Sequence, residues 1–476
     1  MIAPQPTTRR ALRAAGRQPA LPFRVALADG NRLTMLRLLR VLPGKRLVGE
    51  ADLDGRRVLA KLFIGRRGEG HWRKERAGLA ALSAAGIATP PLVAATAMAD
   101  GGFALVTDFL APAESLAETM AYLPPAAFAA GMTLLAPALT VVGRLHAAGL
   151  VQDDLHLGNF LRHDGRLLVV DGGAVRPVCP GHSLPPADAC ANLAILLAQL
   201  PDEWDRRLGE LLPIYGAAAR TAPPALPALQ AAIERIRAWR LDDFLAKTVR
   251  ECTLFAVEHD ATRFCAVRRD ETATLAPWLA SPDQALEAGT VFKDGGTTTV
   301  ARLVVDGRAL LIKRYNLKSL SHAFGRLWRP SRAWHSWREA HRLRFLGIAT
   351  PAPLALIEER VGPLRRRAWL ISEFCAGPNL LHHLSPDEVP PPAEAAAMIA
   401  LFESLHRRRI SHGDLKATNL LWETDRVVLI DLDAVVQHRS AAAHARAWRR
   451  DRARLLRNWP ATSVLHRWLD AHLPAT

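Results

Sequence analysis

Each half of the chain contains a lysine in a strand-like run, followed by a glutamate, an aspartate, an asparagine and a second aspartate. These residues are Lys313, Glu339, Asp414, Asn419 and Asp431 in the second half, and Lys61, Glu75, Asp154, Asn159 and Asp171 in the first. Transfer of a phosphoryl group from ATP needs a lysine on the phosphates, an acid that holds the lysine, oxygen ligands for Mg2+ and a carboxylate that orients the acceptor hydroxyl. The residue types and their order therefore predict phosphoryl-transfer chemistry.

The two sets are related by an internal repeat. Asp154, Asn159 and Asp171 each recur 260 positions later in the chain, together with the Leu-His pair that precedes them. This separation is far beyond the roughly 20 to 50 residues of solenoid units and indicates duplication of a whole domain. Each half is therefore expected to fold around its own core.

Three motifs resemble those of a known family: His412-Gly-Asp-Leu-Lys-Ala-Thr-Asn419, Val427-Val-Leu-Ile-Asp-Leu-Asp433 and Leu310-Leu-Ile-Lys313. They are similar to the catalytic loop, the metal-binding segment and the lysine strand of the protein-kinase-like superfamily. Within it, the chain most closely resembles the bacterial lipopolysaccharide-core kinases that phosphorylate heptose or Kdo. The resemblance covers most of both halves. Leu432 and Asp433 replace the Phe-Gly of protein kinases, which argues against an activation-loop switch.

The resemblance implies a role for each residue, with ATP and Mg2+ as cofactors. Asp414 and Asp154 would be the catalytic bases. The magnesium ligands would be Asn419, Asp431, Asn159 and Asp171. The nucleotide-binding residues would be Lys313, Glu339, Glu373, Lys61 and Glu75. Lys313 and Glu339 are expected to form an ion pair, and Glu373 falls at the hinge that would meet adenine. The polar turn from Lys293 to Thr299 could cover the phosphates, although it is not a G-x-G-x-x-G sequence.

The first-half loop, Val151-Gln-Asp-Asp-Leu-His-Leu-Gly-Asn159, departs from the family pattern at two positions. Gln152 replaces the histidine that usually braces the loop. Asp153 places a second carboxylate beside Asp154, and like charges this close alter each other's pKa. The base in this half is therefore left open between Asp153 and Asp154.

The surrounding pattern indicates the fold that positions these residues. Strand-like runs at 57–63 and 103–107 flank a segment, 72–84, whose apolar residues have helical spacing, and longer helices follow. We expect an α+β fold: two tandem bilobal protein-kinase-like domains, each a small β-rich lobe followed by a larger helical lobe. The expected boundaries are domain 1 at 26–250, a connecting segment at 251–287 and domain 2 at 288–476.

Composition constrains the location and the partners. The net charge of +16 favours an anionic partner, for which we expect the lipopolysaccharide core or another anionic glycolipid. No groove-reading or base-stacking motif accompanies the charge, so no nucleic acid is expected. Interleaved Arg and Trp at 324–337 suit a membrane interface, or else a short helix packed on the small lobe. The scattered cysteines and the absence of a signal-like N-terminus favour the cytoplasm, with peripheral binding to the inner face of the inner membrane.

The predicted function is that of an ATP-dependent kinase for a sugar hydroxyl, of heptose or Kdo, in the lipopolysaccharide core. Two alternatives remain at this point. One is a kinase for proteins or small molecules, since a fold does not determine the acceptor. The other is a pseudokinase scaffold in which only domain 2 is active, because Gln152 alters the support of the first-half loop.

Overall fold

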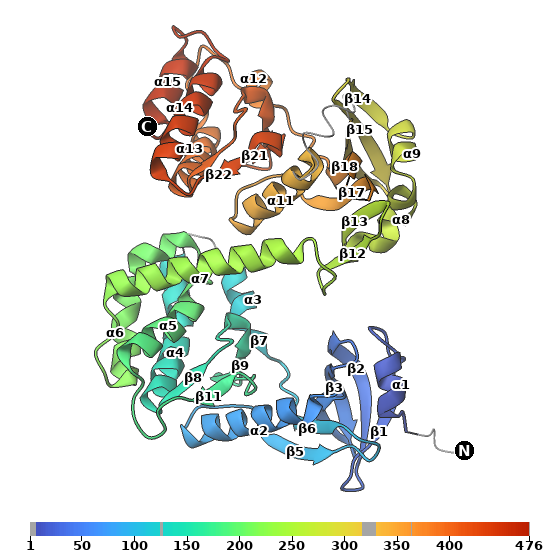
Figure 1. The fold of residues 1–476 in the computed structure, drawn as a ribbon. Coiled ribbons are helices and arrows are strands. Elements are labelled where there is room, and N and C mark those ends of the chain that lie inside the picture. The colour runs from blue at the N-terminus through green and yellow to red at the C-terminus, as the bar shows by residue number, and fades with distance from the viewer. Residues whose placement is uncertain (1–5, 124–126, 317–329, 363, 476) are drawn as a thin grey trace. The chain divides into compact units, whose positions relative to one another are not determined.

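The structure, a computed structural model, describes residues 6–123, 127–316, 330–362 and 364–475 (Figure 1). The chain divides into two compact units, Met1–Trp239 and Arg240–Thr476, called unit 1 and unit 2 below. In each unit a sheet-rich part precedes a helical part. This order confirms the predicted α+β class.

The sheet of unit 1 has six antiparallel strands in the order β1-β2-β3-β4-β6-β5. Alternate residues of β3 are buried, as expected for a strand with one face on a core. That core includes Leu12 from α1, so the predicted start of domain 1 at residue 26 is too late. The strands and the preceding helix are α1 (Arg9–Ala14), β1 (Phe23–Ala26), β2 (Arg32–Leu42), β3 (Arg46–Leu53), β4 (Arg56–Phe63), β5 (Leu92–Ala97) and β6 (Phe103–Asp108).

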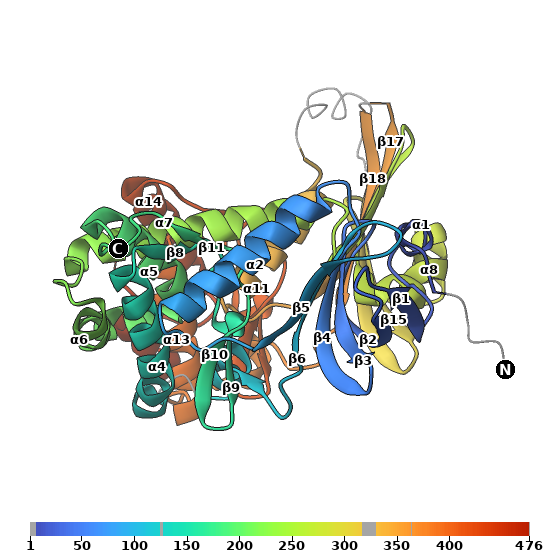
Figure 2. The ribbon, with the colours of Figure 1, turned by 90° about the horizontal axis from the view of Figure 1, so that it is seen from below.

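Helix α2 (Gly68–Ala84) contacts β4 and β6 and runs alongside the sheet of unit 1 (Figure 2). Its buried residues include Trp72, Glu75 and Leu79. The helix also comes very close to the loop that carries Asp171. A Cβ atom on Gly78 would lie 1.8 Å from the main-chain oxygen of Gly172, so two glycines permit this approach.

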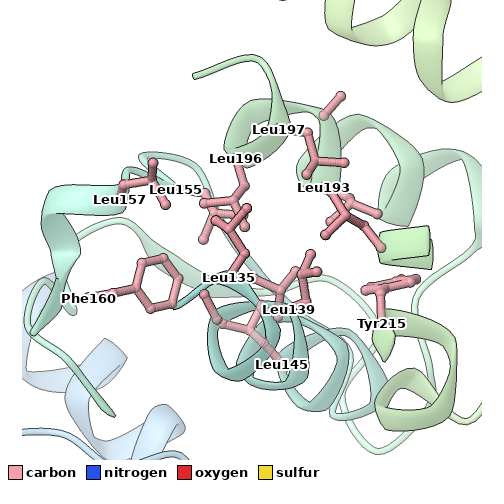
Figure 3. Close-up of a cluster of buried hydrophobic side chains, with 14 of the residues drawn as sticks. Leu135, Leu139, Leu145, Leu155, Leu157, Phe160, Leu193, Leu196, Leu197 and Tyr215 are labelled. Carbon is pink, nitrogen blue, oxygen red and sulfur yellow. The ribbon is translucent and has the colours of Figure 1, made fainter. Parts of the chain in front are cut away.

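The helical part of unit 1 is held by one large apolar core, in which leucines from several helices meet Phe160 and Tyr215 (Figure 3). Its helix α4 is the one helix in the described residues that is long and apolar enough to cross a membrane. One face of α4 packs into this core, through Leu135, Leu139 and Leu145. The elements are β7 (Glu114–Ser115), α3 (Leu116–Ala121), α4 (Phe128–Ala147), β8 (Leu150–Gln152), β9 (Phe160–His163), β10 (Arg166–Val169), β11 (Val175–Pro177), α5 (Pro186–Leu197), α6 (Leu208–Ala219) and α7 (Leu226–Lys247), which continues past Trp239 into unit 2.

The sheet of unit 2 has seven strands in the order β12-β13-β17-β18-β16-β15-β14. Its first two strands come from residues 251–287, which the sequence analysis assigned to a connecting segment. That assignment is wrong because β13 pairs with β17 along five residues and its apolar side chains Cys265 and Val267 enter the core. The elements are β12 (Phe255–His259), β13 (Arg263–Arg268), α8 (Thr272–Ala280), α9 (Pro282–Glu287), β14 (Thr290–Asp294), β15 (Thr298–Val305), β16 (Arg308–Tyr315), α11 (Arg332–Phe345), β17 (Pro353–Val361) and β18 (Leu364–Glu373).

The helical part of unit 2 begins after β18 and has its own apolar core around Phe402, Trp448 and Trp459. Two short strand pairs, β19 with β22 and β20 with β21, hold the loops that carry the polar motifs. The elements are α12 (Leu380–His383), α13 (Pro392–Arg407), β19 (Ile410–Ser411), β20 (Leu420–Glu423), β21 (Arg426–Leu429), β22 (Val436–Gln437), α14 (Ala441–Leu456) and α15 (Val464–His472).

Candidate active site

The loop between β19 and β20 of unit 2 is fixed by hydrogen bonds to its backbone. The buried carboxylate of Asp451 accepts from the backbone N–H groups of His412 (2.6 Å) and Gly413 (3.0 Å). His412 Nε2 in turn lies 2.9 Å from the main-chain oxygen of Ile430. Asn419 Nδ2 donates to the main-chain oxygen of Asp414 over 2.9 Å. These contacts join the loop to α14 and to the end of β21, so the position of Asp414 is set by the fold.

The carboxylate of Asp414 lies between two cations. Lys416 Nζ is 2.9 Å from Asp414 Oδ2, and Arg454 of α14 is 3.0 Å from Oδ1. Partial burial acts to raise the pKa of Asp414, but the hydrogen bond and charge of Lys416 and the charge of Arg454 outweigh it and lower the pKa below its usual value. Asp414 is therefore ionised at neutral pH, as a group that accepts a proton must be.

Asn419 and Asp431 provide oxygen atoms suited to Mg2+. The nitrogen of the Asn419 amide is already bonded to Asp414, which leaves the amide oxygen as its ligand atom. Asp431 follows β21 in the left-handed backbone region, at φ 57°, which turns the chain at this point. The described residues contain no group of three or more His, Cys, Asp or Glu that could hold a metal by itself. Mg2+ is commonly bound by one or two carboxylates together with substrate phosphates.

A cavity of about 540 Å3 lies between the sheet and the helical part of unit 2. Its volume is in the range of small-molecule sites, roughly 300–1,000 Å3. The lining includes Lys313, Asn419, Asp431 and Asp433, together with Glu373, the last residue of β18, and Phe374. The predicted polar turn is the hairpin between β14 and β15, and its residues Lys293, Thr297 and Thr298 line the cavity too.

The predicted ion pair between Lys313 and Glu339 is wrong. Lys313 Nζ lies 2.7 Å from Asp431 Oδ1 and 3.0 Å from Asp433 Oδ2. Glu339 is buried on α11 and pairs instead with Arg342, one turn further along the helix, at 2.9 Å. The prediction failed because a charged partner in the next turn satisfies Glu339, and a second acid lies closer to the lysine.

That second acid, Asp433, is a site residue that the sequence analysis did not assign. Its carboxylate accepts hydrogen bonds from Tyr315 Oη (2.7 Å) and Ser336 Oγ (2.6 Å), and it pairs with Arg332 (2.5 Å) as well as with Lys313. Burial acts to raise its pKa, but the charge of Lys313 and these donors outweigh burial and lower it. The sequence did indicate this residue, because an acid stands two residues after Asp431, where protein kinases have the glycine of Phe-Gly.

Unit 1 brings its own set together, and here the lysine does pair with the helix glutamate. Lys61 forms an ion pair with Glu75 of α2, and its Nζ lies 3.9 Å from Asp171 Oδ1. Burial raises the pKa of Glu75 despite the charge of Lys61. Asn159 Nδ2 donates to the main-chain oxygen of Asp154 over 2.9 Å, as Asn419 does to Asp414.

The departures at Gln152 and Asp153 have structural consequences. Gln152 Nε2 donates to the main-chain oxygen of Asp171 over 3.1 Å, so the glutamine braces the same segment that His412 braces in unit 2. Asp153 is exposed and pairs with Arg176 at 2.9 Å. This pairing neutralises the second carboxylate beside Asp154.

In unit 1, the side chain that accepts a hydrogen bond from the backbone of this loop is uncharged. The side chain of Asn192 replaces the carboxylate found in unit 2: its Oδ1 accepts from the backbone N–H of Gln152 over 3.3 Å. Asn192 also contacts His146 Nε2 at 3.0 Å, and His146 Nδ1 contacts Tyr215 Oη at 2.9 Å. Burial lowers the pKa of His146 to about 4, so this histidine is neutral at physiological pH.

Comparisons with known proteins agree with this geometry. The model of the family described as "Lipopolysaccharide kinase (Kdo/WaaP) family" matches residues 287–469. A search of curated proteins finds no match to the chain.

Many solved structures are similar to parts of the chain, and two serve as examples. Vaccinia related kinase 3 is 13% identical, with 48% of this chain and 89% of that chain covered and a TM-score of 0.29. The PknI kinase domain of Mycobacterium tuberculosis is 15% identical, with 45% and 98% covered and a TM-score of 0.30.

The matched region contains the loop with Asp414 and Asn419, the strand end with Asp431, and the lysine strand with Lys313. Residues 287–469 are thus similar to the lipopolysaccharide kinase (Kdo/WaaP) family, and this similarity supports a kinase.

Proposed function

We propose that unit 2 transfers the γ-phosphate of ATP to a sugar hydroxyl, of heptose or Kdo, in the core of lipopolysaccharide. The observation that carries this proposal is the family match over residues 287–469, which includes every polar residue that lines the cavity around Lys313. The family is a kinase family, and the sugar acceptor is the part that this proposal adds.

The side chains of unit 2 divide the work of such a reaction. Asp414, ionised and fixed through Asn419, accepts the proton of the acceptor hydroxyl and orients its oxygen. Lys313 would bind the phosphates, and Glu373 and Phe374, at the end of β18, would face adenine. Asn419 and Asp431 would hold Mg2+, which would neutralise charge on the phosphates. The remaining catalysis is positioning, because phosphoryl transfer requires little covalent participation by the protein.

We extend the proposal to unit 1 as a second nucleotide site. Lys61, Glu75 and Asp171 already lie together, and Asp154 is held by Asn159 as its counterpart is in unit 2. Because Asp153 is paired with Arg176, Asp154 is the better candidate for the base in this unit.

We propose that the protein binds its acceptor at the cytoplasmic face of the inner membrane as a peripheral protein. The net charge of +16 supports attraction to an anionic glycolipid or to anionic lipid headgroups. Residues 324–329 of the Arg- and Trp-rich segment that motivated this expectation lie outside the described residues. Trp334 and Trp337 are described: Trp337 is fully buried in the core of the sheet part, and Trp334 packs at the edge of that core.

The test is transfer of radiolabel from ATP by the purified chain. The acceptor is lipopolysaccharide from a strain that lacks this gene, incubated with labelled ATP and Mg2+, and the matched control is the Asp414→Asn chain. Label on the core oligosaccharide that disappears in the control supports the proposal. Label on serine, threonine or tyrosine of a protein, with none on the glycolipid, would show a different acceptor and refute the sugar assignment.

A further inference from the structure

The two units hold their phosphate-binding lysines with acids from different places in the chain. In unit 1, Lys61 pairs with Glu75 on helix α2. In unit 2, Lys313 pairs with Asp433, which lies two residues after Asp431. The position in unit 1 that corresponds to Asp433, 260 residues earlier, is Gly173. The acid that pairs with the lysine is therefore on the helix in unit 1 and on the loop in unit 2. In unit 1 the loop position is a glycine.

The two arrangements cannot coexist in unit 1 without a shift of Glu75. A Cβ atom on Gly173 would lie 2.7 Å from Glu75 Oε2 and 3.3 Å from Asp171 Oδ1. A side chain at position 173 would thus displace the carboxylate that holds Lys61. An aspartate here would also place a third acid beside Glu75 and Asp171, which raises the cost of keeping all of them ionised.

Unit 2 has built a support for the acid on the loop. Tyr315 and Ser336 donate hydrogen bonds to one oxygen of Asp433, and Arg332 and Lys313 lie at the other. The side chain of Asp433 is 11% exposed, against 42% for Asp431, so Asp433 is the more enclosed of the two acids on Lys313. A buried carboxylate with four donors is held in one orientation.

Glu339 has a different set of contacts. Its carboxylate pairs with Arg342, and Arg342 also donates to Gln437 beside β22 over 2.6 Å. The helix acid of unit 2 therefore connects α11 to the helical part of the unit. Within the described residues, no ion pair joins Glu339 to Lys313.

We propose that Asp433 is the residue that positions Lys313 for the nucleotide, and that Glu339 does not position it. The proposal rests on the proposed function only in naming ATP as the ligand. In this arrangement the partner of the lysine and the metal-binding Asp431 sit on one three-residue turn. The orientation of Lys313 is then set by the same turn that carries the metal ligand. A shift of the Glu339 carboxylate leaves the orientation of Lys313 unchanged.

The test has two readouts on the full chain, one without nucleotide and one with it. The first is the rate at which an amine-reactive reagent modifies Lys313, measured by mass spectrometry in the absence of ATP. The second is the affinity for Mg-ATP, measured by calorimetry in a chain whose unit 1 carries Lys61→Met. Asp433→Asn is expected to change the reactivity of Lys313 and to weaken Mg-ATP binding by more than about tenfold, since it removes the more enclosed of the two carboxylates that hold this buried charge.

Glu339→Gln is the matched control, because it also removes one carboxylate charge near the same helix. It is expected to leave both readouts within about twofold of the parent, because Glu339 does not pair with Lys313 and distant changes have independent effects. Equal or larger effects from Glu339→Gln would overturn the proposal. So would an Asp433→Asn chain with unchanged Lys313 reactivity.

Two further variants guard against a folding defect in Asp433→Asn. Asp433→Gly reproduces the residue that unit 1 carries and is expected to give the same changes. Gly173→Asp tests the exclusion in unit 1 without touching unit 2: it should make the reactivity of Lys61 insensitive to a second change, Glu75→Gln. If Lys61 stays sensitive to Glu75→Gln, the two acids are not alternatives and the proposal fails.

The two readouts also separate this proposal from the proposed function. If Lys313 responds to Asp433→Asn as expected but the parent chain binds no Mg-ATP, the kinase assignment fails while the pairing stands. If the parent binds Mg-ATP and the reactivity of Lys313 is unchanged in the Asp433→Asn chain, the pairing proposal fails while the kinase assignment stands.

Discussion

Asn419 donates a hydrogen bond from its side-chain amide to the main-chain oxygen of Asp414, over a distance of 2.9 Å. Asn159 makes the same bond to Asp154 at the same distance. The bond fixes the short loop between the two residues in both units. The loops differ in what surrounds the carboxylate, since Asp414 pairs with Lys416 and the corresponding residue in unit 1 is His156.

Replacing the proposed base should separate the activities of the two units. Asp414→Asn keeps the shape of the side chain and removes the proton acceptor, so the kcat of unit 2 is expected to fall by about 10²–10⁴-fold. Asp154→Asn is the corresponding change in unit 1. Mass analysis of the phosphorylated products from each variant shows which unit makes which product. An Asp414→Asn chain with undiminished transfer would exclude Asp414 as the base.

The pH dependence of unit 2 should respond to Lys416. Burial acts to raise the pKa of Asp414, but the hydrogen bond and charge of Lys416 make the largest contribution against it, so the pKa is lowered from its usual value. The carboxylate is therefore ionised at neutral pH. Lys416→Met removes the lowering contribution, and the acid limb of the kcat/KM profile for Asp414 should move to higher pH. A profile between pH 3 and 7 measures this, and an acid limb that moves to lower pH would contradict it.

The contact between α2 and the Asp171 loop predicts a stability difference between two glycines of one helix. A methyl group on Gly78 meets the backbone of Gly172 at 1.8 Å, so Gly78→Ala should lower the free energy of unfolding by at least about 1–3 kcal/mol. Gly70 is exposed with nothing within 4 Å, and Gly70→Ala should raise the free energy by about 0.5–1 kcal/mol. Denaturant unfolding of the full chain measures both. Equal effects of the two changes would count against the close packing.

The hydrogen bonds of Asp451 to the loop backbone predict which of two substitutions at this position is more destabilising. Asp451→Ala leaves the backbone donors of His412 and Gly413 unpaired, at a cost of about 1–3 kcal/mol for each donor. Asp451→Asn should be milder, because Asn192 fills the related role in unit 1. Thermal unfolding and kcat measured together check this order. A more severe effect for Asp451→Asn than for Asp451→Ala would refute it.

Much of this arrangement was predictable from the sequence. The strand with Lys313, the helix with Glu339 and the loop with Asp414 and Asn419 all lie where the motifs predicted them. These elements are encoded locally, by alternating or helical apolar spacing and by turn residues. The cavity brings Lys313, Asn419 and Asp431 together as the motifs implied.

The missed features depend on contacts between residues far apart in the sequence. Lys313 pairs with both Asp431 and Asp433, which lie 118 and 120 positions away. Ser336 and Tyr315, whose hydroxyl groups donate to Asp433, carry no motif of their own. In the same way, strand β13 gives no sign in its sequence that its partner is β17, about 90 residues later.

The glycine at position 173 has a consequence for chemical intervention. Asp433 lines the cavity of unit 2, whereas the corresponding position of unit 1 has no side chain. A nucleotide-competitive inhibitor that carries a cationic group toward this position would meet a carboxylate in one unit and bare backbone in the other. Such a molecule is expected to bind unit 2 more tightly than unit 1, because only unit 2 offers this carboxylate.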